Sequence, residues 1–204
     1  MDESLLIERE HAEHFLAEVV VDGAEVHDDR DVTWVVHEGQ AWRSAGIMVR
    51  LSPSSAARRL DALLARYRKH GRGMTLWVSP SATPPSLTDL LKARRLRCRK
   101  HYPAMIRHVA DRVPRHAFPT ALSIRRLTDP AESATTPHPA IGPLTTPIRR
   151  VAFERLRALL SDPAGRTRAF VAWLDDTPVG AIEIFLGSEA RFACWYRSFQ
   201  RGRS

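Results

Sequence analysis

The stretch AWLDDTPVGAIEIFLG, residues 172–187, predicts two β-strands joined by a tight turn. Strand-forming residues fill TRAFVAWL (167–174) and AIEIFL (181–186), and the intervening DDTPVG supplies the acids, proline and glycine that turns favour. We therefore expect an antiparallel hairpin here, because so short a connection joins neighbouring antiparallel strands.

A second hairpin of the same plan is expected in the first half of the chain. DVTWVV (31–36) and AGIMVRLS (45–52) have strand character, and the polar segment HEGQAWRS separates them. This order of strand, polar turn and strand repeats that of 170–186, although few residues are identical and periodicity alone does not prove a duplication.

Apolar residues three and four positions apart predict helices. One is expected at 5–20, and a second opens at Ser52 and Pro53, because serine caps free amides and proline suits the first helical position. Gly71 ends this second helix. Two further helices are expected to start at Ser86 and at Thr146-Pro147.

Single strands, expected at 74–79, 102–109 and 122–128, complete the order of elements. The first half then reads helix, hairpin, helix, strand, helix, strand, which is a complete small α+β domain. We divide the chain into an N-terminal domain at 1–112, a proline-rich linker at 113–146 that includes the first strand of the second domain, and an incomplete domain at 147–204.

Composition favours a cytoplasmic protein with no membrane contact, since the acidic start MDESLLIERE is unlike a secretory signal and no apolar run approaches a bilayer span. Cys98 and Cys194 are expected to be reduced thiols. Two pairs of residues have sequence spacings like those of metal ligands. They are Cys98 with His101, and His11 with His14. We expect no metal, because zinc needs about four placed ligands.

The net charge of +8 is concentrated most densely in KARRLRCRKHYPAMIRH, 92–108. Such a run can grip phosphates through charge alone. We interpret it instead as the solvated end of a helix and an edge strand, and therefore do not expect nucleic acid as a partner.

FVAWLDDTPVGAIEIFLG resembles the part of GNAT-type N-acetyltransferases where the second strand turns into the third around x-D-G-x-P-V-G. IRRLTDPAE is similar to the first strand and helix start of that domain. The chain from DVTWVV through MTLWVSPSATPPSLTDLLKARRLRC is similar to the degenerate first domain of tandem acetyltransferase-fold proteins. The resemblance covers most of 5–186. It implies an α+β fold, a GNAT-like mixed sheet flanked by helices, in a degenerate N-terminal domain followed by a partial second one.

The resemblance also implies a function, since members of this family move an acetyl group from acetyl-CoA, their co-substrate, to an amine of a small molecule or protein. They hold the cofactor at a helix start, through a loop of pattern Arg/Gln-x-x-Gly-x-Gly/Ala after the fourth strand. Here the matching start SPSSAARR, 52–59, has no glycine, and QRGRS after Gly187 fits the pattern only in part. We therefore expect an acetyltransferase-fold protein with impaired or lost activity and with its binding of acetyl-CoA in question. The alternative is a non-catalytic binding module that uses its basic surface for protein or nucleic acid.

From about Glu189 the sequence loses strand alternation, and we interpret this tail as the frameshifted or truncated end of a longer acetyltransferase. The hairpin at 170–186 would then lack the strands that cover its edge. Either a homodimer paired through this edge or a poorly ordered C-terminal third is expected.

No catalytic or cofactor-binding residue is assigned from the sequence. Glu183 is a candidate base, but its alternation with Ile182 and Ile184 favours an acid that faces outward. Four tryptophans could line a substrate groove, but we favour a packing role between sheet and helices for them. They are Trp34, Trp42, Trp77 and Trp173.

Overall fold

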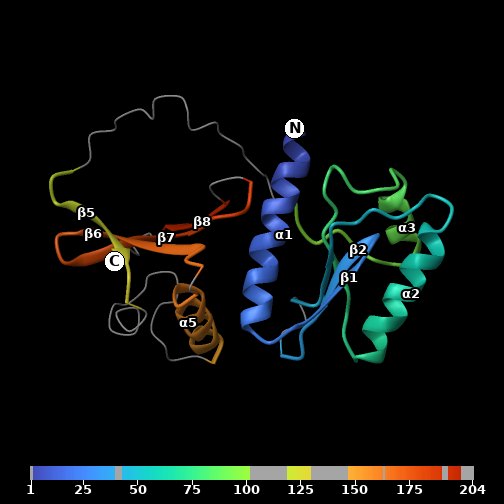
Figure 1. The fold of residues 1–204 in the computed structure, drawn as a ribbon, viewed down its shortest axis with the longest axis horizontal. Coiled ribbons are helices and arrows are strands. Elements are labelled where there is room, and N and C mark those ends of the chain that lie inside the picture. The colour runs from blue at the N-terminus through green and yellow to red at the C-terminus, as the bar shows by residue number, and fades with distance from the viewer. Residues whose placement is uncertain are drawn as a thin grey trace, which may run out of the picture. The chain divides into compact units, whose positions relative to one another are not determined.

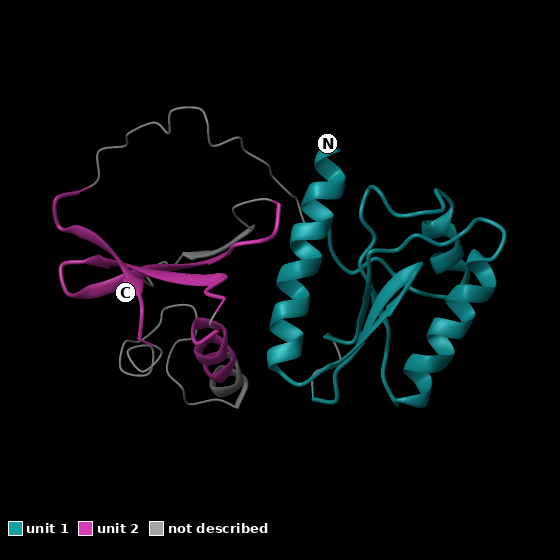
Figure 2. Cartoon of the chain, in the orientation of Figure 1, with its two compact units in different colours: residues 1–107 teal, residues 108–204 magenta. Residues whose placement is uncertain are grey.

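The computed structural model describes residues 2–39, 43–101, 119–129, 147–162, 164–189 and 193–198, with the backbone alone for 147–152 and 193–198. The chain divides into two compact units, Met1–Arg107 (unit 1) and His108–Ser204 (unit 2) (Figure 2). The described residues form four helices and two four-stranded sheets, which confirms the expected α+β class (Figure 1).

Unit 1 has a mixed sheet in the order β1-β2-β3-β4, in which β1, β2 and β3 are antiparallel and β4 runs parallel to β3. The expected hairpin of 31–36 and 45–52 is confirmed by the pairing of β2 with β3. The elements of this unit are α1 (Glu3–Val21), β1 (Glu25–Asp29), β2 (Val32–Val36), β3 (Ala45–Ile47), α2 (Ala56–Lys69), β4 (Thr75–Leu76) and α3 (Leu87–Ala93).

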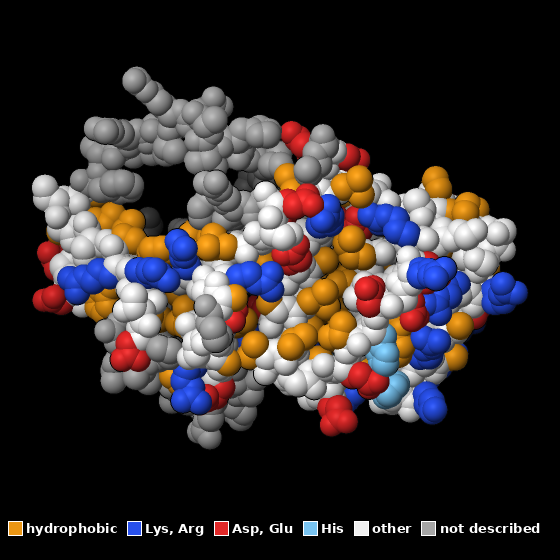
Figure 3. Space-filling view, in the orientation of Figure 1, with side chains coloured by type: hydrophobic (Ala, Val, Ile, Leu, Met, Phe, Trp, Pro, Cys, Tyr) orange, Lys and Arg blue, Asp and Glu red, His pale blue; other side chains and the backbone are white. Residues whose placement is uncertain are grey.

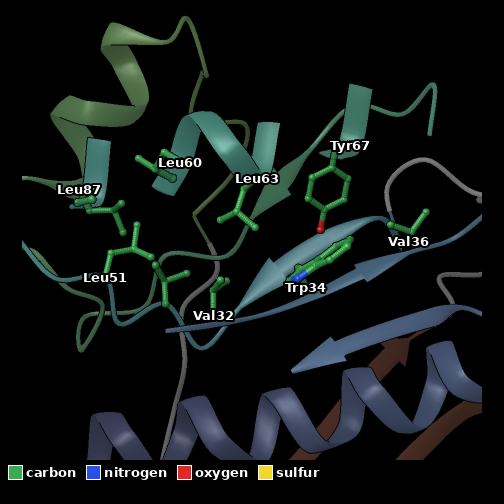
Figure 4. Packing of buried hydrophobic residues seen from close by; sticks show 10 residues of the cluster. Val32, Trp34, Val36, Leu51, Leu60, Leu63, Tyr67 and Leu87 are labelled. Atoms are coloured by element: carbon green, nitrogen blue, oxygen red, sulfur yellow. The ribbon is translucent and has the colours of Figure 1, made fainter. Parts of the chain in front are cut away.

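The two faces of β2 pack into two separate hydrophobic cores, as the alternation of a strand requires. On one face Val35 meets Phe15 and Val19 of α1. The opposite face meets α2 and α3 in a cluster whose labelled side chains in Figure 4 are Val32, Trp34, Val36, Leu51, Leu60, Leu63, Tyr67 and Leu87.

Two boundaries of unit 1 differ from the sequence expectation. The first helical residue of α2 is Ala56 rather than Pro53, because the amides of Ser55 and Ala56 first turn back to the carbonyl of Ser52, at 3.0 and 2.8 Å. The strand expected at 74–79 pairs only over β4, since the chain leaves β3 after the amide of Trp77. Gly71 follows α2 with φ +65°, as expected for a helix end.

Unit 2 has an antiparallel sheet in the order β5-β6-β7-β8, with α5 on one face. Leu127, Phe153, Leu156 and Ala169 form the buried cluster between helix and sheet. The elements of this unit are β5 (Leu122–Leu127), α5 (Pro147–Leu160), β6 (Thr167–Leu174), β7 (Thr177–Phe185) and β8 (Ala193–Ser198).

The expected hairpin of 167–174 and 181–186 is confirmed, with a tighter turn than expected. β6 and β7 pair from Leu174 with Thr177 onward, so that only Asp175 and Asp176 form the turn. Asp175 has φ +52°, a conformation that two-residue hairpin turns require.

The expectation that the chain after Gly187 lacks strand character is wrong. β8 pairs antiparallel with β7 from Gly180 opposite Ser198 to Phe185 opposite Ala193, so the edge of β7 is covered and its amides are not left for another chain. Backbone pairing with a neighbour here outweighs the weak alternation of the sequence. The strand expected at 102–109 and the helix start at Asp129-Pro130 lie mostly or wholly outside the described residues.

Both units place a helix before three consecutive antiparallel strands. α1 is followed by β1, β2 and β3, and α5 is followed by β6, β7 and β8. By this order the hairpin of β6 and β7 corresponds to β1 and β2, not to β2 and β3 as the sequence comparison suggested. The strand that the sequence missed, β1 (EVHDD), is too polar to be recognised by hydrophobic pattern.

Within the part of the chain that the structure describes, no helix has both the length and the apolar character needed to cross a membrane.

Candidate functional site

The start of α2 lies at the carboxyl end of β3, where the family resemblance places a phosphate loop. Ser52, Pro53 and Ser54 are exposed there, and Ser55 caps the helix without a side-chain hydrogen bond. Free amides of a first helical turn favour anions. Pro53, however, has no amide hydrogen, and Ala56 is fully buried in the core. The helix start is thus accessible but lacks the glycine that would let a pyrophosphate approach its backbone closely.

Arg59, the last residue of the SPSSAARR segment, is already bound to carboxylates. Its Nε and Nη2 donate to the two oxygens of Asp31, each at 2.9 Å, and its Nη2 also donates to Asp29. Hydrogen bonds from Arg59 are the main reason why the pKa of Asp29 is lowered. Because this guanidinium neutralises two acids, it is a poor partner for an added phosphate.

A second polar group gathers where the parallel strands β3 and β4 separate. The amide of Trp77 still donates to the carbonyl of Gly46, at 2.9 Å. The two segments pair again further along, where the amide of Thr83 donates to the carbonyl of Val49, at 3.2 Å. Between these points Met48 has φ +54°. Separated ends of parallel strands are common ligand sites in α/β sheets.

Glu8 of α1 occupies this separation and is bound from the sheet side. Nη1 of Arg50 donates to its Oε1 at 3.1 Å, and Nη2 of Arg50 and the hydroxyl of Ser81 both donate to its Oε2. Burial alone would raise the pKa of Glu8, but the hydrogen bonds from Arg50, Ser81 and Ser79 outweigh it, so the pKa is lowered. The carboxylate is therefore ionised at neutral pH and fixed in place.

His11, one helical turn beyond Glu8, packs its ring on Trp77 with 4.6 Å between the ring centroids. Burial lowers the pKa of His11 despite the nearby carboxylates of Glu18 and Glu8, which act to raise it. A neutral imidazole beside a fixed carboxylate has the parts of a general base. Since Arg50 and Ser81 already bind the carboxylate, these contacts anchor α1 to the sheet, and we assign no catalytic residue here.

Unit 2 places Glu183 differently from the sequence expectation. Glu183 pairs with Ala169, which belongs to the core beneath α5, so it lies on the same sheet face as Ala181 and Phe185. The expectation that it faces outward is wrong, because Ile182 and Ile184 point to the opposite face. Glu183 is half-buried.

Trp34 and Trp77 have the predicted packing role. Trp34 is 4% exposed within the unit 1 core, and its indole donates to Asp29 at 3.1 Å. Trp77 is partly buried beside the core under α1. Trp173 lies under the guanidinium of Arg125, whose Cζ is 5.7 Å from the ring centroid. Trp42 lies outside the described residues.

Of the two pairs with metal-ligand spacing, the structure brings the side chains of Cys98 and His101 together. Sγ of Cys98 is 3.4 Å from Nε2 of His101, and both residues are exposed. His14 lies 3.9 Å from Glu18, away from the Trp77 contact of His11. Among the residues that the structure describes, no three His, Cys, Asp or Glu side chains group as a metal site would need.

Sequence reasoning missed one buried polar group in unit 1. Arg43, 1% exposed, forms an ion pair with Asp22, and Nε2 of His37 lies 4.0 Å from the same carboxylate. The hydroxyl of Ser44 accepts a hydrogen bond from the backbone amide of His37 rather than contacting the ring. Asp22, His37 and Ser44 therefore do not form a nucleophile with its base. Nothing in the pattern of the sequence marks Arg43 as buried.

No protein-family model matches this chain. Comparison with curated proteins and with solved structures likewise yields no match.

Proposed function

We propose that both units of this protein carry the acetyltransferase fold of the GNAT type, and that the protein is related to enzymes that move an acetyl group from acetyl-CoA to an amine. The observation that carries the proposal is the path from β3 through α2 to β4. A helix follows the third antiparallel strand of unit 1 after the segment 48–55, and the next strand returns parallel to it. With β5 of unit 2 counted as the family's first strand, β1, β2 and β3 of unit 1 correspond to its second, third and fourth strands. On this proposal the accessible start of α2 corresponds to the place where the family holds its cofactor.

The common order of helix and three antiparallel strands in the two units supports a tandem arrangement. Unit 2 adds β5, antiparallel to β6, in the position expected for the first strand of the resemblance.

The proposal includes an impaired cofactor site in unit 1. Pro53 supplies no amide donor, the segment 52–59 has no glycine, and Arg59 is bound to Asp29 and Asp31. Each of these features weakens the interactions that would hold a pyrophosphate. We therefore expect α2 to bind acetyl-CoA weakly or not at all.

Calorimetric titration of the purified chain with acetyl-CoA tests the impaired site. The expected result is no saturable heat at α2. As a probe, Ser54→Glu places a negative charge at the start of α2, and Thr88→Glu places the same charge in the exposed first turn of α3. One-to-one binding that Ser54→Glu abolishes and Thr88→Glu preserves would show an intact site at α2 and would contradict this part of the proposal.

The fold itself is tested separately by an experimental structure of the chain. Nuclear magnetic resonance or crystallography is expected to find β4 parallel to β3 and α2 between them. An antiparallel β4, or β4 paired with β1, would remove the observation on which the acetyltransferase proposal depends.

A further inference from the structure

Unit 1 separates its charges along the sequence. Residues 2–38 contain twelve acids and two arginines, whereas residues 43–101 contain two acids and fourteen arginines and lysines. The fold keeps much of this separation, because the glutamate-rich α1 and the arginine-rich α2 cover opposite faces of the sheet (Figure 1). The glutamates of α1 and the arginines of α2 are therefore separated by the sheet.

Several acids are neutralised individually by arginines of the basic segment. These ion pairs are Arg43 with Asp22, Arg50 with Glu8, Arg59 with Asp29 and Asp31, and Arg66 with Asp29. The two acids within 43–101 are also matched. Asp61 receives two hydrogen bonds from Arg94, at 2.7 and 2.9 Å, and Asp89 lies 3.5 Å from Lys92. Ion pairing thus offsets the acids near α2 and leaves a surplus of positive charge.

The surplus is exposed on α2 and on the segment that follows α3, and we call these two parts together the basic face. Arg94 joins its two parts: besides binding Asp61, it donates to the carbonyl of Ala57 at 2.9 Å, which holds the segment after α3 against the first turns of α2. Figure 3 shows Lys and Arg side chains gathered over α2. The basic face consists of the exposed residues Arg58, Arg68, Lys69, Arg95, Arg97 and Arg99.

The outer side of α2 is shaped for close approach of an extended anion. Ala62 and Ala65 are exposed between Arg58 and Lys69, so the middle of the helix has short side chains and its ends carry charge. At 1.5 Å per residue the helix is about 21 Å long. Duplex DNA carries about one charge per 1.7 Å of its axis, so several phosphates fall within reach.

Although the sequence alone favours a solvated surface over a nucleic acid partner, we propose from the charge distribution of the folded unit that the basic face binds the phosphate backbone of nucleic acid without reading its bases. Four exposed arginines and one lysine accompany Arg58 on this surface, and guanidinium groups match phosphate oxygens in pairs. Protein interfaces depend instead on buried aromatic or apolar anchors, which this face does not offer among its described residues. Its short side chains at Ala62 and Ala65 cannot reach into a groove, so binding depends on charge.

Fluorescence anisotropy with a labelled 20-base-pair duplex measures this binding. With about four phosphate contacts, raising salt from 50 to 200 mM is expected to weaken binding about 100-fold. Failure to saturate at 50 mM salt, or an affinity that salt leaves unchanged, would overturn the proposal.

A matched pair of charge reversals locates the contact. Arg68→Glu lies on the basic face and Arg9→Glu on α1, and both change an exposed arginine of a long helix. Arg68→Glu is expected to weaken binding at least 10-fold at 50 mM salt, and Arg9→Glu less than twofold. Equal losses would mean that only net charge matters, which contradicts a defined face.

A second variant and a competitor complete the test. Arg97→Gln with Arg99→Gln is expected to lower the slope of log affinity against log salt by about two, because each phosphate contact contributes about 0.9. Thermal unfolding should show that these exposed changes leave the fold intact. If the protein binds poly-glutamate more tightly than the duplex at an equal concentration of charge, the partner is an acidic protein surface and the nucleic acid proposal is wrong.

Discussion

Arg50 holds the carboxylate of Glu8 with both of its terminal nitrogens across 42 positions of sequence. The side chain of Glu8 is 7% exposed and that of Arg50 29%, so the pair is mostly shielded from water. The contact fixes α1 at the point where β3 and β4 separate. Loss of either partner would leave a poorly solvated charge behind.

Glu8→Gln is expected to lower the free energy of unfolding by about 2 kcal/mol, toward the low end for shielded pairs because Arg50 keeps some contact with water. Urea unfolding at pH 7 measures this change. Glu3→Gln, an exposed acid of the same helix, is the control and should change stability by less than about 0.5 kcal/mol. Equal effects of the two changes would mean that the ion pair contributes nothing specific.

The lowered pKa of Glu8 also predicts a pH dependence. A carboxyl group with a folded pKa below its ordinary value stabilises the fold at pH values above that ordinary value, and this contribution is lost as pH falls through the folded pKa. Unfolding midpoints measured from pH 7 down to pH 3 should therefore fall more steeply for the wild type than for Glu8→Gln. Parallel curves would contradict the assignment.

Arg59→Lys is expected to destabilise unit 1 by about 1 kcal/mol. An ammonium group cannot make the bidentate contact with Asp31 and also bind Asp29. Arg58→Lys, at the exposed neighbouring position, is the matched control and should be neutral. Thermal unfolding of both variants measures the difference. A loss in Arg58→Lys as large as that in Arg59→Lys would indicate helix propensity rather than ion pairing.

Leu63→Ala is expected to cost about 3 kcal/mol, since Leu63 is 1% exposed within the core of α2 and the sheet. Leu64→Ala removes the same atoms from a half-buried position one residue along and should cost about 1 kcal/mol. Chemical denaturation compares them. A reversed order would mean that α2 presents a different face to the sheet.

The pairing of β7 with β8 predicts slow amide hydrogen exchange in Ala181–Phe185. Of the two variants Tyr196→Pro and Arg197→Pro, one removes an amide that faces β7, because successive amides of a strand point to opposite edges. That variant should speed exchange in β7, whereas exchange between β5 and β6 should stay slow. Fast exchange of the wild-type β7 amides would contradict the pairing. The homodimer expected from the sequence was to pair through the edge that β8 covers, so light scattering on the same sample is expected to find no dimer.

Local patterns predicted most of the helices and the two hairpins, because each has an apolar face of regular period or a turn of recognisable composition. β1 was missed since EVHDD owes its strand conformation to pairing with β2 and not to its own residues. β8 was missed for a similar reason. Backbone pairing with the neighbouring strand leaves little trace in the residues of one segment, and therefore pattern reading fails there.

The candidate sites were less predictable than the fold. The sequence marked SPSSAARR as a helix start, but it did not reveal that Arg59 would turn to Asp29 and Asp31. Glu183 was assigned to the wrong face, because strand alternation shows which residues share a face and not which face a helix covers. The division into acidic and basic halves was readable from composition once the chain was divided near residue 40.

That division also sets an order of events while the chain is being made. The acids of 2–38 leave the ribosome before any of the arginines that neutralise them. The ion pair of Glu8 cannot form until Arg50 has emerged. Until then like charges repel and keep the segment extended. We expect unit 1 to fold in one step after its basic half emerges, so a peptide of residues 1–39 should show no stable helix by circular dichroism. A helical peptide would mean that α1 forms during synthesis without its partners.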